Sequence, residues 1–200
     1  MSGMIGLVNY GMAGNIYSIR KALEKAGADV VLVEDARALE RVDKIVLPGV
    51  GSFADAMSEI HKAALFEPLR NAMQEKPTLG ICLGMQILAS LGFEFGETKG
   101  FDLVGAEVKP MVCHGQVPHM GFNDLQIVRP SALLNGIEDE QFYFMHSYEM
   151  VNYTDVAALT TYAGHTFVSS VQKETLFGVQ FHPEKSRDAG IELFKNFMTL

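Results

Sequence analysis

The sequence predicts an α/β fold: an open, mostly parallel, doubly wound sheet with an antiparallel section in the C-terminal half. Two observations predict this architecture. Short apolar runs alternate with helical patterns through the first half of the chain, whereas strand patterns joined only by turns fill the second half. Alternating strands and helices are typical of a parallel sheet with helices on both faces. The 200 residues, 48% of them hydrophobic, suit one compact domain spanning 1–200.

The first half is expected to begin with an apolar strand and to continue in strand–helix pairs. Asn15 is expected to cap the first helix and Gly27 to end it. The expected strands are residues 5–8, 30–33, 44–47 and 78–81. The expected helices are residues 16–26, 53–60, 65–75 and 83–91. Because ligands bind at the carboxyl ends of strands in such a sheet, we expect the loop 48–53 and Cys82 to lie at one site.

The second half contains strand patterns in close succession, which indicates the antiparallel section. The expected strands are residues 103–111, 124–128, 141–146, 157–162, 166–172 and 176–181. A final helix at 188–198 is expected to cover one face of the sheet. No repeat, low-complexity segment or linker interrupts the pattern, which again favours a single domain.

Composition excludes several classes of protein. The net charge of −8 argues against nucleic-acid binding, which needs clustered Lys and Arg. The sequence contains no apolar run of 18 residues, so we expect no membrane span, and the first residues lack the features of a signal peptide. Cys82 and Cys113 fit a reducing compartment better than a disulfide framework. We therefore expect a cytoplasmic protein.

A cysteine flanked by glycines, at the end of the fourth expected strand, is the strongest functional signal. It lies in the run Gly80-Ile81-Cys82-Leu83-Gly84-Met85-Gln86. A Gly-x-Cys-x-Gly turn between a strand and a helix has the make-up of a nucleophile elbow, which holds the thiol on a sharp bend. The dipole of the following helix favours the thiolate, the nucleophilic form. A lone cysteine is more often an inert core residue, so this interpretation requires a base.

A candidate base lies much later in the chain. The run Gln180-Phe181-His182-Pro183-Glu184-Lys185-Ser186 follows an expected strand. If the chain stays extended through Pro183, His182 and Glu184 point to the same face. The carboxylate would then orient the imidazole while the imidazole activates the thiol. Together the two motifs predict a triad of Cys82, His182 and Glu184.

These motifs resemble those of the class I, or triad-type, glutamine amidotransferases, which carry a Gly-x-Cys-x-Gly-x-Gln elbow and a later His-Pro-Glu. Further stretches narrow the resemblance to the glutaminase subunits of imidazole glycerol phosphate synthases. They are Asn9-Tyr10-Gly11 with Gly14-Asn15, and the runs 47–53, 117–123 and 143–148. The resemblance extends from near Met4 to the C-terminus. It implies hydrolysis of glutamine to glutamate and ammonia. We expect no cofactor and no metal, because Cys113-His114 lacks the three or four ligands of a zinc site.

The resemblance also implies roles for residues around the triad. The backbone N–H of Leu83 and the turn that contains Val50 and Gly51 are expected to form an oxyanion hole. A peptide rotation at Val50, thought to switch this hole on in the family, is made inexpensive by the flanking glycines. The residues expected to contact glutamine are Gly49, Gln86, His146, Ser147 and Tyr148. Simpler interpretations stay open: an ordinary strand-to-helix turn, a glutamine on a helix surface, and a buried histidine at a strand end.

The implied partner is a (β/α)₈-barrel synthase subunit, which would form a heterodimer with this chain and use its ammonia to make imidazole glycerol phosphate in histidine biosynthesis. The residues implied to face it are His119, Met120, Phe122 and Lys185, with a solvated surface charge as the alternative interpretation of Lys185. The chain departs from the family pattern at Asn9, Ala13, Phe122 and Met145. These departures keep open a paralogue that supplies ammonia to a sugar-modifying enzyme. A non-catalytic scaffold and a hydrolase of γ-glutamyl peptides are disfavoured, the first because the whole triad is present.

Overall fold

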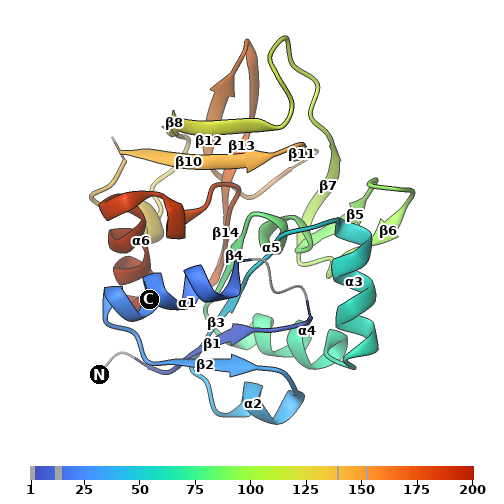
Figure 1. Cartoon of the computed structure of the whole chain (residues 1–200), viewed down its shortest axis with the longest axis vertical. Helices are drawn as coiled ribbons and strands as arrows, with labels where there is room; N and C mark the ends of the chain where they lie inside the picture. The colour runs from blue at the N-terminus through green and yellow to red at the C-terminus, as the bar shows by residue number, and fades with distance from the viewer. Residues whose placement is uncertain (1–2, 12–14, 139, 152) are drawn as a thin grey trace.

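A computed structural model describes residues 3–11, 15–138, 140–151 and 153–200 (Figure 1). Over these residues the chain forms a sheet of eight strands, in the order β2-β1-β3-β4-β14-β13-β12-β9, and two smaller sheets. Neighbouring strands are parallel from β2 to β14 and antiparallel from β14 to β9. The predicted α/β class, with a mostly parallel sheet and an antiparallel section, is therefore confirmed.

The parallel strands are continuous apolar runs, because helices cover both of their faces. The four runs predicted in the first half coincide with the first four strands, and the fifth parallel strand comes from the end of the chain. Their bounds are β1 (Ile5–Val8), β2 (Val30–Val33), β3 (Lys44–Leu47), β4 (Thr78–Ile81) and β14 (Leu176–Val179).

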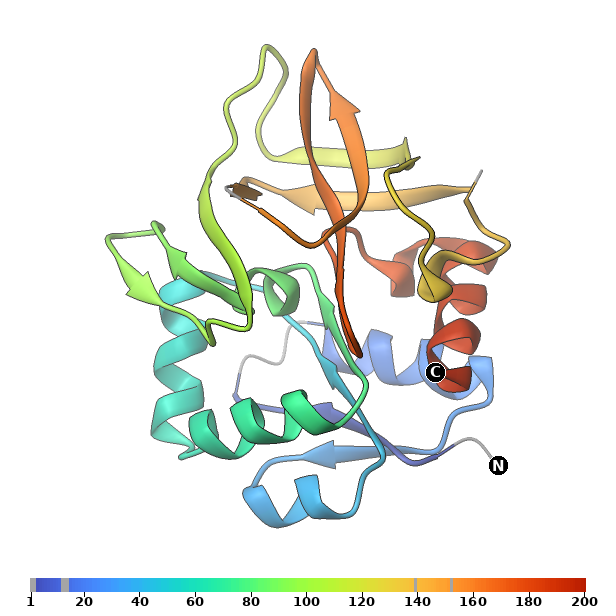
Figure 2. The same ribbon diagram turned by 180° about the vertical axis from the view of Figure 1, so that it is seen from behind.

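Two pairs of helices cover the two faces of the parallel strands. On one face α1 (Ile16–Ala26) and α6 (Arg187–Thr199) pack against each other and cover the side chains that point to that face of the sheet, such as Val46 of β3. On the other face α3 (Phe53–Lys62) and α4 (Phe66–Glu75) cover the alternate residues, including Leu47, as the opposite views in Figures 1 and 2 show. No helix in the described part of the chain is long and apolar enough to cross a membrane.

The remaining strands form three groups, in which every pair is antiparallel except β5 with β7, which are parallel. β13 (His165–Lys173), β12 (Val156–Tyr162) and β9 (Gln126–Ile127) extend the main sheet. β8 (His119–Asp124) and β10 (Gln141–His146) pair as a two-stranded ribbon. The third group is a sheet in the order β11-β7-β5-β6, comprising β11 (Tyr148–Val151), β7 (Val104–Pro110), β5 (Ala89–Gly92) and β6 (Thr98–Lys99).

The helix predicted at 83–91 is wrong over most of its length. Only α5 (Leu83–Gln86) is helical, and β5 follows at Ala89. The chain extends there because β5 pairs with both β6 and β7, and the carbonyl of Ile87 accepts the N–H of Phe101 at 2.8 Å. This tertiary pairing outweighs a local helical preference.

Several smaller expectations were also wrong. The side chain of Asn15 makes no capping hydrogen bond to α1, although Gly27, with a φ of 98°, ends that helix as predicted. The strand predicted at 124–128 is the end of β8 followed by the short β9. Four further elements had no prediction: α2 (Ala36–Glu40), β6, β11 and the 3₁₀ turn η1 (Ala132–Leu134).

Candidate active site

A pocket of about 280 Å³ lies where the carboxyl ends of β3, β4 and β14 meet the junction between β10 and β11. Its volume is at the small end of the roughly 300–1,000 Å³ typical of small-molecule sites. The pocket brings together residues that are far apart in the chain. Those predicted from the sequence are Gly49, Val50, Gly51, Cys82, Leu83, Gln86, His146, Ser147, Tyr148 and His182.

Cys82 lies on a strained turn between β4 and α5. Its φ is +53°, in the left-handed region that costs a non-glycine residue about 1–2 kcal/mol. Its N–H donates to the carbonyl of Val179 at 2.8 Å, which fixes the turn against β14. A Cβ on Gly84 would overlap the carbonyl oxygen of Leu47, so only glycine lets α5 approach β3 this closely. The local structure is the predicted elbow, with a much shorter helix.

His182 and Glu184 form a buried pair beside the elbow. Nδ1 of His182 lies 2.8 Å from Oε1 of Glu184, and both side chains are fully buried. The chain is not extended through Pro183, as had been expected. It forms the 3₁₀ turn η2 (Pro183–Lys185), which brings the carboxylate back to the ring. Nδ2 of Asn15 donates to the same Oε1 at 3.1 Å, which explains why this side chain is absent from the helix cap.

The His182 ring is positively charged in this setting. Burial disfavours the charge, but the sulfur of Cys82 and the carboxylate of Glu184 outweigh burial and raise the pKa of His182 to about 10. Nε2 of His182 has no hydrogen bond of full geometry among the described residues, but the Cys82 sulfur is close enough to raise the pKa of the ring both as a hydrogen-bond acceptor and through its charge. Nε2 is the ring atom left for a molecule entering the pocket.

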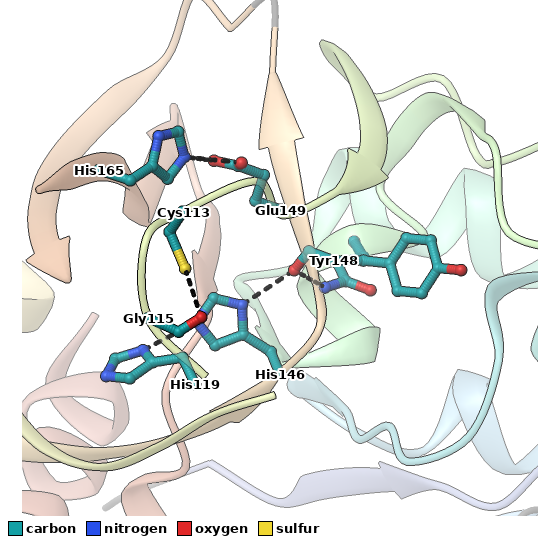
Figure 3. Close-up of polar contacts among 8 residues, drawn as sticks. Cys113, Gly115, His119, His146, Tyr148, Glu149 and His165 are labelled. Carbon is teal, nitrogen blue, oxygen red and sulfur yellow. Dashed lines mark hydrogen bonds and ion pairs between the residues drawn. The ribbon is translucent and has the colours of Figure 1, made fainter. Parts of the chain in front are cut away.

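The opposite wall of the pocket is electrically neutral. Burial, together with the neighbouring His119 and His182, lowers the pKa of His146 to about 4. Its Nδ1 lies 2.9 Å from the carbonyl oxygen of Tyr148 and must donate to it, so its Nε2 accepts from Nδ1 of His119 at 3.2 Å (Figure 3). His146 is therefore a satisfied, buried histidine that also lines the pocket.

Two glutamine side chains connect this neutral wall to the sulfur. Nε2 of Gln86 donates to the carbonyl of Tyr148 at 3.1 Å and to Oε1 of Gln180 at 3.0 Å. Nε2 of Gln180 in turn donates to Sγ of Cys82 at 3.5 Å. Both N–H groups of Gln86 are thereby used within the protein. Gln86 also lines the pocket, and its contact with the amide or α-carboxylate of glutamine stays a prediction.

The loop after β3 brings Gly49 against the elbow. A Cβ on Gly49 would lie 2.5 Å from the backbone nitrogen of Gly84, so a glycine is required for this approach. The loop is also held from the first strand, because the buried hydroxyl of Tyr10 donates to the carbonyl of Pro48 at 2.7 Å. Burial, with the nearby Cys82, raises the pKa of Tyr10, so this hydroxyl stays protonated and remains a donor.

Sequence reasoning missed several residues at the pocket. Glu94, Pro118 and Met145 line it, and Gln180 contacts the sulfur from behind. Glu94 also accepts the N–H of Phe53 at 2.8 Å, at the start of α3. Gln180 carried a usable signal, because it is two residues from His182 and directly follows β14, which pairs with β4. Glu94 and Pro118 lie outside the predicted elements, and Met145 lies in the predicted strand 141–146, where nothing marked it as facing the pocket.

The residues expected to face a partner divide into two groups. Met120 and Phe122 are 57% and 37% exposed on β8. Phe122 contacts the ring of Tyr143 on β10, and the Lys185 ammonium lies 5.7 Å from the centre of the same ring. His119 is instead buried against Phe144 and Tyr162, because its side chain points to the opposite face of β8 from those of Met120 and Phe122. A surface role for the His119 side chain is therefore wrong.

The positions that depart from the family pattern lie outside the catalytic pair. Nδ2 of Asn9 donates to Glu34 at 2.7 Å. Phe122 packs on Tyr143 and under the Arg187 guanidinium, whose carbon is 4.5 Å from the ring centre. Met145 lines the pocket, with its carbonyl oxygen 4.0 Å from the Cys82 sulfur. Ala13 lies outside the described residues.

Comparison with known proteins gives one consistent relationship. The model of the family "Glutamine amidotransferase class-I" matches residues 7–200. The imidazole glycerol phosphate synthase subunit HisH of Moorella thermoacetica is 43% identical over 196 residues, covering 96% of this chain and 93% of that protein. The HisH subunit of Methanothermobacter thermautotrophicus is 42% identical over 198 residues, covering 98% of each chain.

A solved structure of a glutamine amidotransferase shares the fold. It superposes with a TM-score of 0.77 at 18% identity, covering 99% of this chain and 100% of the other. At that identity the likeness concerns the fold alone, whereas the family match and the relatives of about 40% identity span nearly the whole sequence. The chain therefore belongs to the class-I glutamine amidotransferases and, within them, to the family of HisH subunits of imidazole glycerol phosphate synthase.

Proposed function

We propose that this protein hydrolyses glutamine to glutamate and ammonia, as the glutaminase subunit of an imidazole glycerol phosphate synthase. The observation that carries the proposal is the pocket in which a cysteine on an elbow meets a histidine paired with a buried carboxylate. The identity of about 40% to HisH subunits over nearly the whole chain supports the same reaction. Both cysteines are free, which fits work in the reducing cytoplasm.

The reaction would begin with attack of the Cys82 thiolate on the side-chain amide carbon of glutamine. The amide oxygen then carries the negative charge, and the backbone N–H groups of Leu83 and of the Val50–Gly51 turn are the donors we assign to it. One such donor is worth about 3 kcal/mol. His182 would protonate the amide nitrogen, which leaves as ammonia. The glutamyl thioester that remains is hydrolysed by water to glutamate and free thiol.

The charge arrangement supports His182 as the acid. While the sulfur is a thiolate, its charge helps to hold the proton on the ring and keeps the pKa high. Once the sulfur has bonded to carbon, that charge is lost and the proton becomes easier to release. The release would coincide with the step that needs it, because the nitrogen leaves poorly without a proton. Glu184 would keep the ring oriented throughout.

The ammonia would pass to a (β/α)₈-barrel subunit that forms imidazole glycerol phosphate. We place this partner against the surface formed by Met120, Phe122 and Lys185, which lie together around β8 and Tyr143. A docked partner would keep ammonia from becoming ammonium, which is not a nucleophile. Glutamine turnover should therefore be slow alone and rise strongly with the barrel subunit and its ligand.

The test is glutamine turnover by wild type, Cys82→Ala and His182→Ala, each with the barrel subunit and its ligand. Both variants should lose glutamine-dependent synthesis of imidazole glycerol phosphate. With added ammonium salt as the nitrogen source, all three complexes should retain synthesis, since that route bypasses the cysteine. Undiminished ammonia release by Cys82→Ala would end the proposal.

A further inference from the structure

We propose that Gln180 stabilises the reactive thiolate of Cys82, and that Gln86 positions it by fixing which end of its amide faces the sulfur. The inference rests on the proposed function for its purpose, but its evidence is a set of hydrogen bonds. Gln180 is fully buried and its Nε2 lies 3.5 Å from Sγ of Cys82.

The sulfur needs a donor of this kind. An elbow cysteine ordinarily gains stabilisation from the helix that follows it, but α5 has only four residues and then the chain turns into β5. So short a helix supplies little of a full macrodipole. His182 interacts with the sulfur, yet its Nε2 does not reach the geometry of a full hydrogen bond to it. The amide of Gln180 supplies an N–H donor that does.

The direction of that hydrogen bond is decided at the far end of the chain of contacts. The oxygen of Tyr148 is a backbone carbonyl and can only accept, so the group of Gln86 that faces it must be the NH₂. The same NH₂ faces Gln180, which must therefore present its oxygen to Gln86. The NH₂ of Gln180 is then the end that remains for the sulfur.

The Gln180 amide favours the thiolate, in competition with the Met145 carbonyl, which accepts from the thiol at 4.0 Å. A thiolate accepts from an N–H, whereas a thiol beside the same N–H gains much less from it. A reversed amide would place a carbonyl oxygen against the sulfur, where it would repel the thiolate and accept from the thiol. Figure 3 shows the anchor of the relay, with the Tyr148 carbonyl contacted by His146 from the neutral wall. The carbonyl of Tyr148 thus accepts two hydrogen bonds. A rotated Gln86 amide would place its oxygen against this carbonyl, so the observed orientation is favoured.

The test measures the thiolate directly, without glutamine or a partner. The full chain is alkylated with iodoacetamide over a range of pH, and modification of Cys82 is followed by peptide mass spectrometry, which separates it from Cys113. Gln180→Met keeps the buried shape and removes the donor. Its alkylation profile should move to higher pH, and its rate near neutrality should fall about tenfold, the effect of losing one hydrogen bond to a charged acceptor.

Three variants make the interpretation specific. Gln180→Glu keeps the acceptor toward Gln86 but places oxygen at the sulfur, and should move the profile further than Gln180→Met. Gln86 makes no hydrogen bond to the sulfur, yet Gln86→Met should shift the profile in the same direction, because it removes the hydrogen bond that fixes the orientation of the Gln180 amide. Gln126→Glu, exposed on β9, adds the same charge elsewhere and should leave the profile unchanged.

A wild-type profile in folded Gln180→Met overturns the proposal. If circular dichroism shows that this variant is unfolded, the Gln86→Met profile decides in its place, and an unshifted profile there overturns the relay. These outcomes are separate from the glutaminase assay: a protein that fails to hydrolyse glutamine with the barrel subunit would refute the proposed function, whether or not the alkylation profiles shift.

Discussion

The two walls of the pocket each contain a buried histidine, and the two rings are driven to opposite charge states. On the wall built by the parallel strands, the pKa of His182 is raised to about 10. On the wall built by the β10–β11 junction, the pKa of His146 is lowered to about 4. Burial opposes the charge on both rings, so burial does not explain the difference. The partners do: the Cys82 sulfur and the Glu184 carboxylate lie beside His182, whereas a carbonyl and another histidine contact His146.

One small pocket thus holds an acid on one wall and a neutral, hydrogen-bonded histidine on the other, so that a single bound amino acid would contact both. A charged ring on the His146 side would compete with His182 for the thiolate. A neutral ring on the His182 side would leave the departing nitrogen without a proton.

Glu184→Gln should break the charged wall. The amide removes the anion that holds the His182 ring in its charged form and in its orientation. By analogy with the loss of the carboxylate from a serine-protease triad, glutamine hydrolysis in the complex should fall about 10³- to 10⁴-fold. The measurement is steady-state glutaminase activity with saturating barrel subunit and ligand. The matched control is Glu192→Gln, which removes only a surface ion pair with Lys195. Activity of Glu184→Gln within tenfold of wild type would contradict this account of the wall.

His146→Gln should change how stability depends on pH. The pKa of His146 is about 6.5 in the unfolded chain and about 4 in the folded protein, so between these pH values only the unfolded chain binds the proton. The free energy of unfolding therefore falls as the pH falls through this window. The full difference is roughly 3 kcal/mol. Urea unfolding from pH 7 to 4 should show this loss in wild type and a shallower one in the variant. The exposed His114→Gln is the control, and an equal slope in all three proteins would refute a neutral His146.

Gly84→Ala should show how tightly the charged wall is built. The added methyl would overlap the Leu47 carbonyl, which lies in the backbone and cannot move alone. We expect a loss of about 2 kcal/mol in the free energy of unfolding, as for other overpacked sites. Gly105→Ala on β7 is the matched control, because its Cβ would meet only the Thr154 hydroxyl, at 3.7 Å. Equal unfolding midpoints for the two variants would show that the elbow is less constrained than described.

Asn15→Ala should have the smallest effect. It removes one of the two donors to Oε1 of Glu184 and leaves the other, from His182, in place. The net worth of a hydrogen bond to a charged acceptor is about 1.5 kcal/mol, so turnover of glutamine should fall about tenfold with little change in KM. The alanine also removes a buried, unpartnered oxygen, Oδ1 of Asn15, so stability should change little. A loss as large as that in Glu184→Gln would mean that Asn15 has a second task.

The wall built by the parallel strands was largely predictable from sequence. Its strands are uninterrupted apolar runs, and its chemistry follows them at once: Cys82 comes directly after β4, and His182 comes soon after β14. Both signals are local. The contact between His182 and Glu184 was predicted for the wrong reason, since an extended chain was assumed where the 3₁₀ turn η2 forms.

The neutral wall followed only from the family resemblance, because no local pattern marks it. His146 reads as the end of a buried strand, and its hydrogen bonds to His119 and Tyr148 depend on how β8, β10 and β11 are brought together. The same reason hid β5, whose residues favour a helix until β7 pairs with them. Gln180 was overlooked although its position two residues before His182 was a signal, because the contact of an amide with a distant sulfur has no sequence pattern of its own.

The backbone of His182 is joined to the β8–β10 ribbon through one residue. Its N–H donates to the carbonyl of Tyr143 at 2.8 Å, and the Tyr143 ring contacts Phe122 on the exposed face. Ser186 adds a second tie, accepting from the N–H of Tyr143 and donating to the carbonyl of His182. A displacement of the ribbon would therefore be passed to the backbone that carries the imidazole through these few hydrogen bonds.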